Sequence, residues 1–554
     1  MLPRFLIGLA ALAMAACAPA AATTTRAPAP VPAEVEQGTP VRMAPITLRE
    51  ASTDWHLRDF ATDGVFGIGV HRAYREILAG RQPRRTVVVA ILDSGVDTVH
   101  ADLRPNLWIN TRETANGADS DRNGYVDDIR GWGFIGNPDG RNVHLDTYEV
   151  TRLHVACTRG AETGIAGPVQ NLDARFCEEV RERFEHDRSE AEQILQNVIS
   201  IDAALSQVLP LLRQAAGTDS LTRESVDRIS STRPEVREAR QMFLQLLASG
   251  ITPQLVEEAR KEFRSQLEYK LNPNFDPRGI VGDDYQNLAE RHYGNSDVMG
   301  PDAAHGTHVA GIIAAARGNE LGMDGIATGV KIMSVRTVPD GDERDKDVAN
   351  AIRYAVDNGA HIINMSFGKA FSPQKQVVDE AVRYAESRGV LLVHAAGNDG
   401  EDVAETPSYP SPFYDDGGRA RNWIEVGASS WKGLDSLAAP FSNYGREQVD
   451  LFAPGEDIYS TVLDGGYDSN SGTSMAAPVV SGVAALLMAY YPDLTAVDVR
   501  RIILESATRR PDQMVVRPGS DGERVRFGDL SATGGIVNAY EAVRMAESLS
   551  GSGR

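Results

Sequence analysis

The chain has 554 residues, a formal net charge of −21, 42% hydrophobic residues and 24% charged residues. This balance is typical of a folded protein and excludes an intrinsically disordered chain. The acidic excess argues against nucleic acid as a partner, because phosphate binding requires clustered Lys and Arg. Three cysteines in a chain of this length exclude a disulfide-rich scaffold.

The N-terminus has the pattern of an export signal over residues 1–17. Arg4 precedes an apolar, Ala-rich run that is too short to span a bilayer. The tripeptide that ends in Cys17 resembles a bacterial lipobox, so we expect a lipid on Cys17 that anchors the protein in the cell envelope, at the outer membrane or in the periplasm. Ordinary cleavage that releases a secreted protein is the alternative. Residues 18–45, rich in Ala, Pro and Thr, predict an extended linker.

An alternation of strands and helices begins near residue 86. Amphipathic helices are predicted over 345–357 and 373–388, and an apolar helix over 479–490. The apolar runs typical of strands buried on both faces of a parallel sheet are 86–92, 330–335, 361–365, 390–395 and 424–428. This rhythm predicts an α/β fold with a doubly wound, mostly parallel sheet, whose active site lies beyond the carboxyl ends of the strands.

Four polar residues stand where such an active site is expected. Asp93 ends the first predicted strand, His305 opens a helical segment, and Asn398 follows another strand. Ser474 stands at the N-terminus of the last apolar helix, where free backbone N–H groups face a developing anion. Pro478 is expected in the first turn of that helix.

In this order the four segments resemble the motifs of the subtilisin-like serine proteases (subtilases), over about residues 50–135 and 290–545. The resemblance implies a serine endopeptidase with Asp93, His305 and Ser474 as the catalytic triad, Asn398 in the oxyanion hole, and no cofactor for the chemistry. All 11 histidines precede Ser474, which excludes the Ser–acid–His order of α/β-hydrolases. Two alternatives stay open: a peptide-binding protein without hydrolytic activity, and a transpeptidase.

The resemblance also implies that peptide or protein substrates add as a strand to exposed edges. The matching segments are 334–338 and 366–368, with Ser334, Val335, Ser366, Phe367 and Gly368 as expected substrate contacts. His308 is expected to be a packed helix residue, because no His-Glu-x-x-His zinc motif occurs. His394 is expected to be a core residue, because it lies in a predicted buried strand.

An acidic loop resembles the first part of an EF-hand and predicts a structural Ca²⁺ site. Arg130 occupies the position of the usual bidentate Glu, and Asp128 offers a further oxygen. A solvated acidic turn is the alternative. The expected ligands are Asp119, Asp121, Asn123, Tyr125 through its carbonyl, and Asp127.

A long insertion separates Asp93 from His305. We expect residues 141–290 to form a helical subdomain with helices over 173–200, 202–216, 234–249 and 253–271, between catalytic parts 46–140 and 291–546, with a tail at 547–554. Its role as a lid, a docking surface or a dimer contact stays open, as does the oligomeric state. If Cys17 carries lipid, Cys157 and Cys177 are expected to form a disulfide in the oxidising compartment; two buried free thiols are the alternative.

Overall fold

A computed structural model describes residues 50–169 and 172–551. The predicted signal, Cys17 and the predicted linker lie outside these residues. The described chain divides into two compact units, a helical unit of residues 178–274 and an α/β unit that contains the rest.

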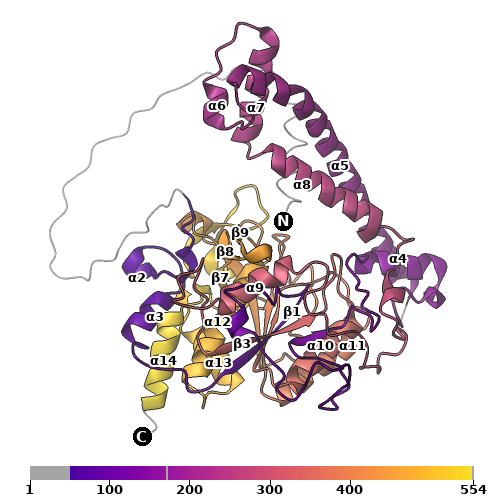
Figure 1. The fold of residues 1–554 in the computed structure, drawn as a ribbon, viewed down its shortest axis with the longest axis vertical. Coiled ribbons are helices and arrows are strands. Elements are labelled where there is room, and N and C mark those ends of the chain that lie inside the picture. Colours follow the sequence, from indigo (N-terminus) through magenta and orange to yellow (C-terminus); the bar gives the residue numbers. More distant parts are fainter. Residues whose placement is uncertain (1–49, 170–171, 552–554) are drawn as a thin grey trace, which may run out of the picture. The chain divides into compact units, whose positions relative to one another are not determined.

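The α/β unit is built on a nine-stranded sheet with the order β10-β13-β7-β6-β5-β4-β1-β3-β2 (Figure 1). Its pairs are parallel except for β10 with β13. The strands are β1 (Val87–Asp93), β2 (Gly131–Gly133), β3 (Val330–Arg336), β4 (Ile362–Met365), β5 (Leu391–Ala395), β6 (Trp423–Ser429), β7 (Leu451–Pro454), β10 (Thr508–Arg509) and β13 (Gly535–Ile536). The predicted doubly wound α/β fold is confirmed, and all five predicted strands are present.

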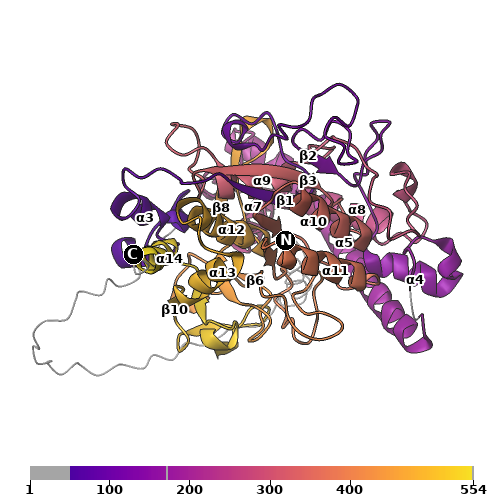
Figure 2. The ribbon, with the colours of Figure 1, turned by 90° about the horizontal axis from the view of Figure 1, so that it is seen from below.

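Helices cover both faces of this sheet (Figure 2). In β1, Val89 and Ile91 pack into the core that contains α9 and α12, whereas Ala90 and Leu92 pack into the core that contains α10 and α11. Burial on both faces explains why β1 is a continuous apolar run. The helices are α9 (Ala304–Ala314), α12 (Thr473–Tyr490), α13 (Ala496–Glu505), α14 (Ala539–Gly551) and α3 (Val70–Glu76) on the first side, and α10 (Asp345–Asp357) and α11 (Lys375–Ser387) on the second.

Short elements complete the α/β unit. They are α2 (Phe60–Asp63), the antiparallel pair β8 (Ile458–Thr461) and β9 (Tyr467–Asn470), and the antiparallel pair β11 (Met514–Val516) and β12 (Arg524–Arg526). By length and composition α5 and α12 could each cross a membrane, but α12 is almost wholly buried and is the central core helix. For α5, length and composition alone are weak evidence for a membrane-spanning helix.

The helical unit contains one long helix where two were expected. Helix α5 runs without interruption over Ala174–Ala216, because the predicted break near residue 201 contains neither Gly nor Pro. Pro210 lies inside the helix. The other helices are α6 (Arg223–Asp227), α7 (Pro234–Ala248) and α8 (Pro253–Ser265), and α8 continues into a π-helical turn over Gln266–Lys270.

The helical unit, residues 178–274, covers a shorter range of the chain than the predicted insertion of residues 141–290. Helix α4 (Glu149–Arg159) belongs to the α/β unit, and its Glu149 and Arg152 side chains are fully buried there. Charged residues can be buried in this way only when they are paired. At the other end of the chain, residues 547–551 of the predicted tail belong to α14 (Ala539–Gly551), and its last three residues lie outside the described part of the chain.

Candidate active site

An aspartate and a histidine meet at the carboxyl edge of the sheet. Asp93 is the last residue of β1 and His305 the second of α9, and Asp93 Oδ1 lies 2.8 Å from His305 Nδ1. The Ser94 N–H donates to the same oxygen at 2.8 Å. Gly306 allows this approach, because a Cβ there would lie 2.1 Å from the carbonyl oxygen of Gly95.

The environment of His305 favours its protonated form. Burial alone would lower its pKa, but the charge of Asp93, the hydrogen bond to it and the charge of Asp302 together raise the pKa above 6.5. Because a carboxylate only accepts, Nδ1–H is the donor to Asp93, and Nε2 is left to take a proton. The pair therefore has the geometry of an oriented general base.

Ser474 is the second residue of α12 and is linked to Ser366 by two hydrogen bonds. Its Oγ donates to the Ser366 carbonyl at 3.1 Å, and its own carbonyl accepts from Ser366 Oγ at 3.0 Å. That carbonyl lacks a helical partner because Pro478, four residues later, has no N–H; Pro478 is the sixth residue of α12 and not part of its first turn as expected. Among the described residues the Ser474 hydroxyl donates to the Ser366 carbonyl and not to His305.

Asn398 follows β5 and is oriented by Thr473, the residue before Ser474. Its Oδ1 accepts from Thr473 N at 2.9 Å and from Thr473 Oγ1 at 3.0 Å. Since a backbone N–H is an obligatory donor, the amide oxygen must face Thr473. The Nδ2 hydrogens are then left for a substrate oxygen near Ser474.

A pocket of about 240 Å³ opens beside the Asp93–His305 pair. His144, from the predicted insertion of residues 141–290, also lines it, and no sequence pattern indicates this role. The other lining residues are Ser94, Pro301, Asp302, Arg336, Val338, Pro339, Asp340, Ser366 and Phe367.

Two of the five expected substrate contacts line this pocket, Ser366 and Phe367. Ser334 and Val335 do not, which corrects their assignment: β3 lies between β1 and β2, so both residues are buried inside the sheet and are not on an exposed edge. Gly368 is exposed, and a Cβ there would lie 2.8 Å from Ser408 Oγ.

Two histidines outside the site are packed residues, as expected. His308 is fully buried with Nε2 3.2 Å from the Asp468 carbonyl. His394 is fully buried between Glu425, at 2.8 Å from Nδ1, and the Phe367 carbonyl, at 2.8 Å from Nε2.

The acidic loop brings together a set of carboxylates that differs from the predicted one. Asp119 accepts from the Gly124 N–H at 2.8 Å and Asp127 from the Asn116 N–H at 2.9 Å, so both serve the loop backbone. Asp121 instead faces Glu113 and Asp128, and carboxylate oxygens of these three lie within 4.8 Å of one another.

Other groups in this loop are engaged within the protein. Asn123 donates through Nδ2 to Asp128 at 2.9 Å, and the Tyr125 ring packs against Trp132. Burial raises the pKa of Asp128 despite its hydrogen bonds. The sequence pattern missed Glu113 because it precedes the loop.

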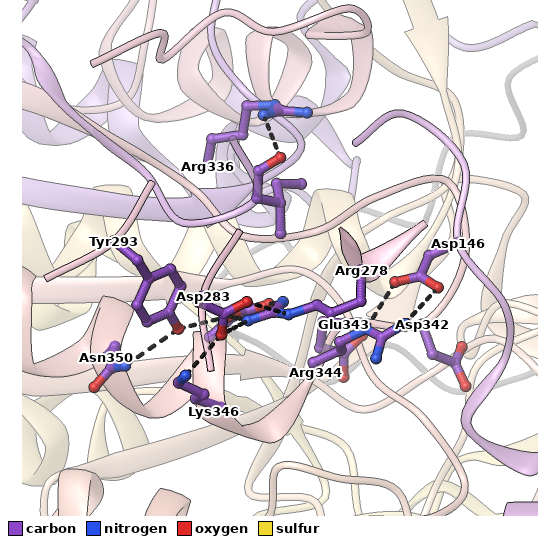
Figure 3. Close-up of polar contacts among 12 residues, drawn as sticks. Asp146, Arg278, Asp283, Tyr293, Arg336, Asp342, Glu343, Arg344, Lys346 and Asn350 are labelled. Atoms are coloured by element: carbon purple, nitrogen blue, oxygen red, sulfur yellow. Dashed lines mark hydrogen bonds and ion pairs between the residues drawn. The ribbon is translucent and has the colours of Figure 1, made fainter. Parts of the chain in front are cut away.

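A buried ionic network surrounds the segment 340–347 (Figure 3). Arg344 Nε lies 2.9 Å from Asp146, and Arg278 pairs with Asp347 and Asp283 at 2.6 Å each. The sequence alone does not reveal this network, because dense charges such as those of residues 342–347 are typical of a solvated turn.

Cys157 of α4 and Cys177 of α5 are joined in a disulfide with a Cα–Cα distance of 5.5 Å. This is the predicted pairing.

A parallel sheet with an Asp–His pair and a helix-terminal serine at its carboxyl edge defines a serine-peptidase type of site. The chain matches the Subtilase family over residues 84–522, and it belongs to that family.

Similar proteins include the "Thermophilic serine proteinase" of Bacillus sp. (strain AK1), 40% identical over 39% of this chain and 48% of that protein. "Subtilisin Savinase" of Lederbergia lenta is 38% identical over 43% of this chain and 77% of its own. A solved cold-adapted subtilisin-like serine proteinase is 31% identical, with a TM-score of 0.34 over 43% of this chain and 77% of that one. The chain spans about half the length of the AK1 protein and 55% of the alkaline elastase of Bacillus sp. (strain YaB).

Proposed function

We propose that this protein is a serine endopeptidase that hydrolyses peptide bonds with Asp93, His305, Ser474 and Asn398. The observation that carries the proposal is the 2.8 Å contact of Asp93 with His305 beside a pocket that is also lined by Ser366, the hydrogen-bond partner of Ser474. Membership of the subtilase family supports it.

In the proposed reaction Ser474 Oγ turns toward His305 and attacks the scissile carbonyl carbon. His305 Nε2 takes the hydroxyl proton and returns it to the leaving amine, while Asp93 holds the ring and stabilises its charged form. The Asn398 Nδ2 and the Ser474 N–H donate to the developing oxyanion. Water then hydrolyses the acyl-enzyme by the same proton transfers in reverse, and no cofactor enters the chemistry.

The direct test is hydrolysis of a chromogenic peptide by the purified protein, with labelling by a serine-directed fluorophosphonate. Ser474→Ala and His305→Ala should each lower kcat by several orders of magnitude, and the double variant should be little worse than either. Peptide binding without turnover or labelling in the wild type would support the non-hydrolytic alternative. Additive losses would contradict a paired nucleophile and base.

We also propose a structural Ca²⁺ ion held by Glu113, Asp121 and Asp128. Three carboxylates so close together repel one another without a cation, and hard oxygen ligands suit Ca²⁺. Arg112 lies 3.2 Å from Asp121 and offsets part of this charge. The effect of a chelator on the melting temperature distinguishes a bound Ca²⁺ from neutralisation by Arg112 alone.

Export with a lipid on Cys17 remains a proposal that rests on the sequence pattern of residues 1–17. The intact mass of protein extracted from membranes tests it. A diacylglyceryl group on an N-terminal Cys17 is expected, and an unmodified N-terminus at another residue would refute the anchor.

A further inference from the structure

We infer that the substrate groove of this protein ends at the third residue before the scissile bond, where Lys369 and helix α4 close it. The inference rests on the proposed peptidase function. It assigns to Lys369 and Glu149 a role in specificity: they block the place where a fourth substrate residue would bind.

The first step is the register of a substrate strand on the edge formed by residues 366–368. The Ser366 carbonyl lies 3.1 Å from Ser474 Oγ, so the substrate residue immediately before the scissile bond lies opposite Ser366. In a paired strand each step along the substrate, counted back from the scissile bond, is matched by one step along the protein edge from Ser366. The third substrate residue therefore lies opposite Gly368 and the fourth opposite Lys369.

The main-chain hydrogen bonds agree with this register. Lys369 uses both its N–H and its carbonyl on Tyr409, each at 2.9 Å. Because neighbouring residues of a strand direct their main-chain groups to opposite sides, those of Gly368 face the groove. Gly368 is exposed, and among the described residues its N–H and carbonyl make no hydrogen bond.

The second wall of the groove is the segment 338–345, whose residues Val338, Pro339 and Asp340 line the pocket. The side chain of Lys369 crosses to this segment from the edge formed by residues 366–368. Its Nζ lies 3.0 Å from the Glu343 carbonyl, 2.7 Å from Glu149 and 2.9 Å from Asp345, and all of these residues are buried. A strand opposite Lys369 would have to displace this ammonium group.

Helix α4 fills the space behind this ammonium group. Arg152 donates to the Asp342 carbonyl at 3.2 Å and to the Glu343 carbonyl at 3.3 Å, so the second wall has no free acceptors at these positions (the side chains of Asp342 and Glu343 are shown in Figure 3). Burial alone would raise the pKa of Glu149, but the charges of Arg152 and Lys369 lower it to about 2. Glu149 therefore stays ionised at neutral pH and keeps its ion pair with Lys369.

The second wall is also occupied nearer to the catalytic pair. Asp340 donates its N–H to the His144 carbonyl at 2.8 Å and accepts from the Asp146 N–H at 3.1 Å. The pocket lining accordingly includes Asp340 and His144 and stops before residue 341. A peptide enters over these residues and must turn away from the protein after its third position.

The test is a series of acetylated peptide p-nitroanilides that grow from one to five residues before the leaving group. For the wild type we expect kcat/KM to rise with each residue up to the third, and to change less than about twofold with the fourth and fifth. A tenfold rise on adding the fourth residue would overturn the inference. Failure to cleave any member, together with no fluorophosphonate labelling, would instead refute the proposed function.

A pair of matched double variants identifies the closing residues. Lys369→Ala with Glu149→Ala removes both charges of the closure, and we expect at least a fivefold gain from the fourth residue. Lys375→Ala with Asp379→Ala removes a comparable Lys–carboxylate pair of 2.8 Å on α11 and should keep the wild-type length profile. A folded Lys369 variant with that same profile would overturn the assignment, and if the variant does not fold, the wild-type series decides.

Discussion

The orientation of Asn398 by Thr473 leads to a prediction that tests the proposed oxyanion hole. Thr473→Val keeps the shape of the side chain and the backbone hydrogen bond of 2.9 Å to Asn398, but removes the Oγ1 bond of 3.0 Å. It also removes the acceptor for the Gly397 N–H at 3.1 Å. A neutral hydrogen bond contributes about 1 kcal/mol, which corresponds to about a fivefold loss of kcat.

The assay is a double-mutant cycle in steady-state kinetics. Asn398→Ala should lower kcat by about 10²–10³ with little change in KM, because the oxyanion exists only in the transition state. Adding Thr473→Val to Asn398→Ala should cost nothing further, since no amide is left to orient. The matched control is Thr533→Val, which removes a hydrogen bond of 2.9 Å to the Asp450 carbonyl. It should leave kcat unchanged. An equal loss from Thr473→Val in both backgrounds would refute the reasoning.

Three further predictions concern pH, the disulfide and calcium. Because the pKa of His305 is raised above 6.5, kcat/KM should fall as the pH drops through that raised pKa. Asp93→Asn should move this acidic limb of the pH profile to lower pH and lower the plateau of kcat/KM about 10⁴-fold. An acidic limb that does not move would contradict the assignment of His305 as the base. Reduction of the disulfide, which closes a separation of 20 residues, should lower the free energy of unfolding by about 3 kcal/mol, measured by denaturant titration against a Cys-free variant. Chelation should lower the Tm of the wild type and of Asp119→Ala but not of Asp121→Ala, and an equal effect in all three would place the ion elsewhere.

The strands and the residues at their ends could be predicted because their signals are local. A strand buried on both faces is mostly apolar, and β1 and β3 to β6 are mostly apolar and almost wholly buried. Asp93 ends such a strand and Asn398 follows another, whereas His305 and Ser474 open helices of the same α/β unit. The topology therefore brings all four to one edge of the sheet.

The remaining features depend on partners that are distant in the chain. The sequence predicts an exposed edge at Ser334 and Val335, but β2 covers that edge; β2 is only three residues long and has no strand signal of its own. The contacts of Lys369 with Glu149 span 220 residues. No local pattern distinguishes such a buried ion pair from charges that face solvent.

The position of the helical unit within the chain has a consequence for folding. β1 must pair with β3, from which roughly 240 residues separate it, and each doubling of a loop adds only about 0.6 kcal/mol of closure entropy. The helical unit supplies less than half of that loop, so its presence adds very little to the entropic cost of pairing β1 with β3. The long closure does slow the pairing, because distant parallel strands meet late. Until then the apolar run of β1 has no partner on either edge, and an unpaired apolar strand of this kind is prone to aggregation.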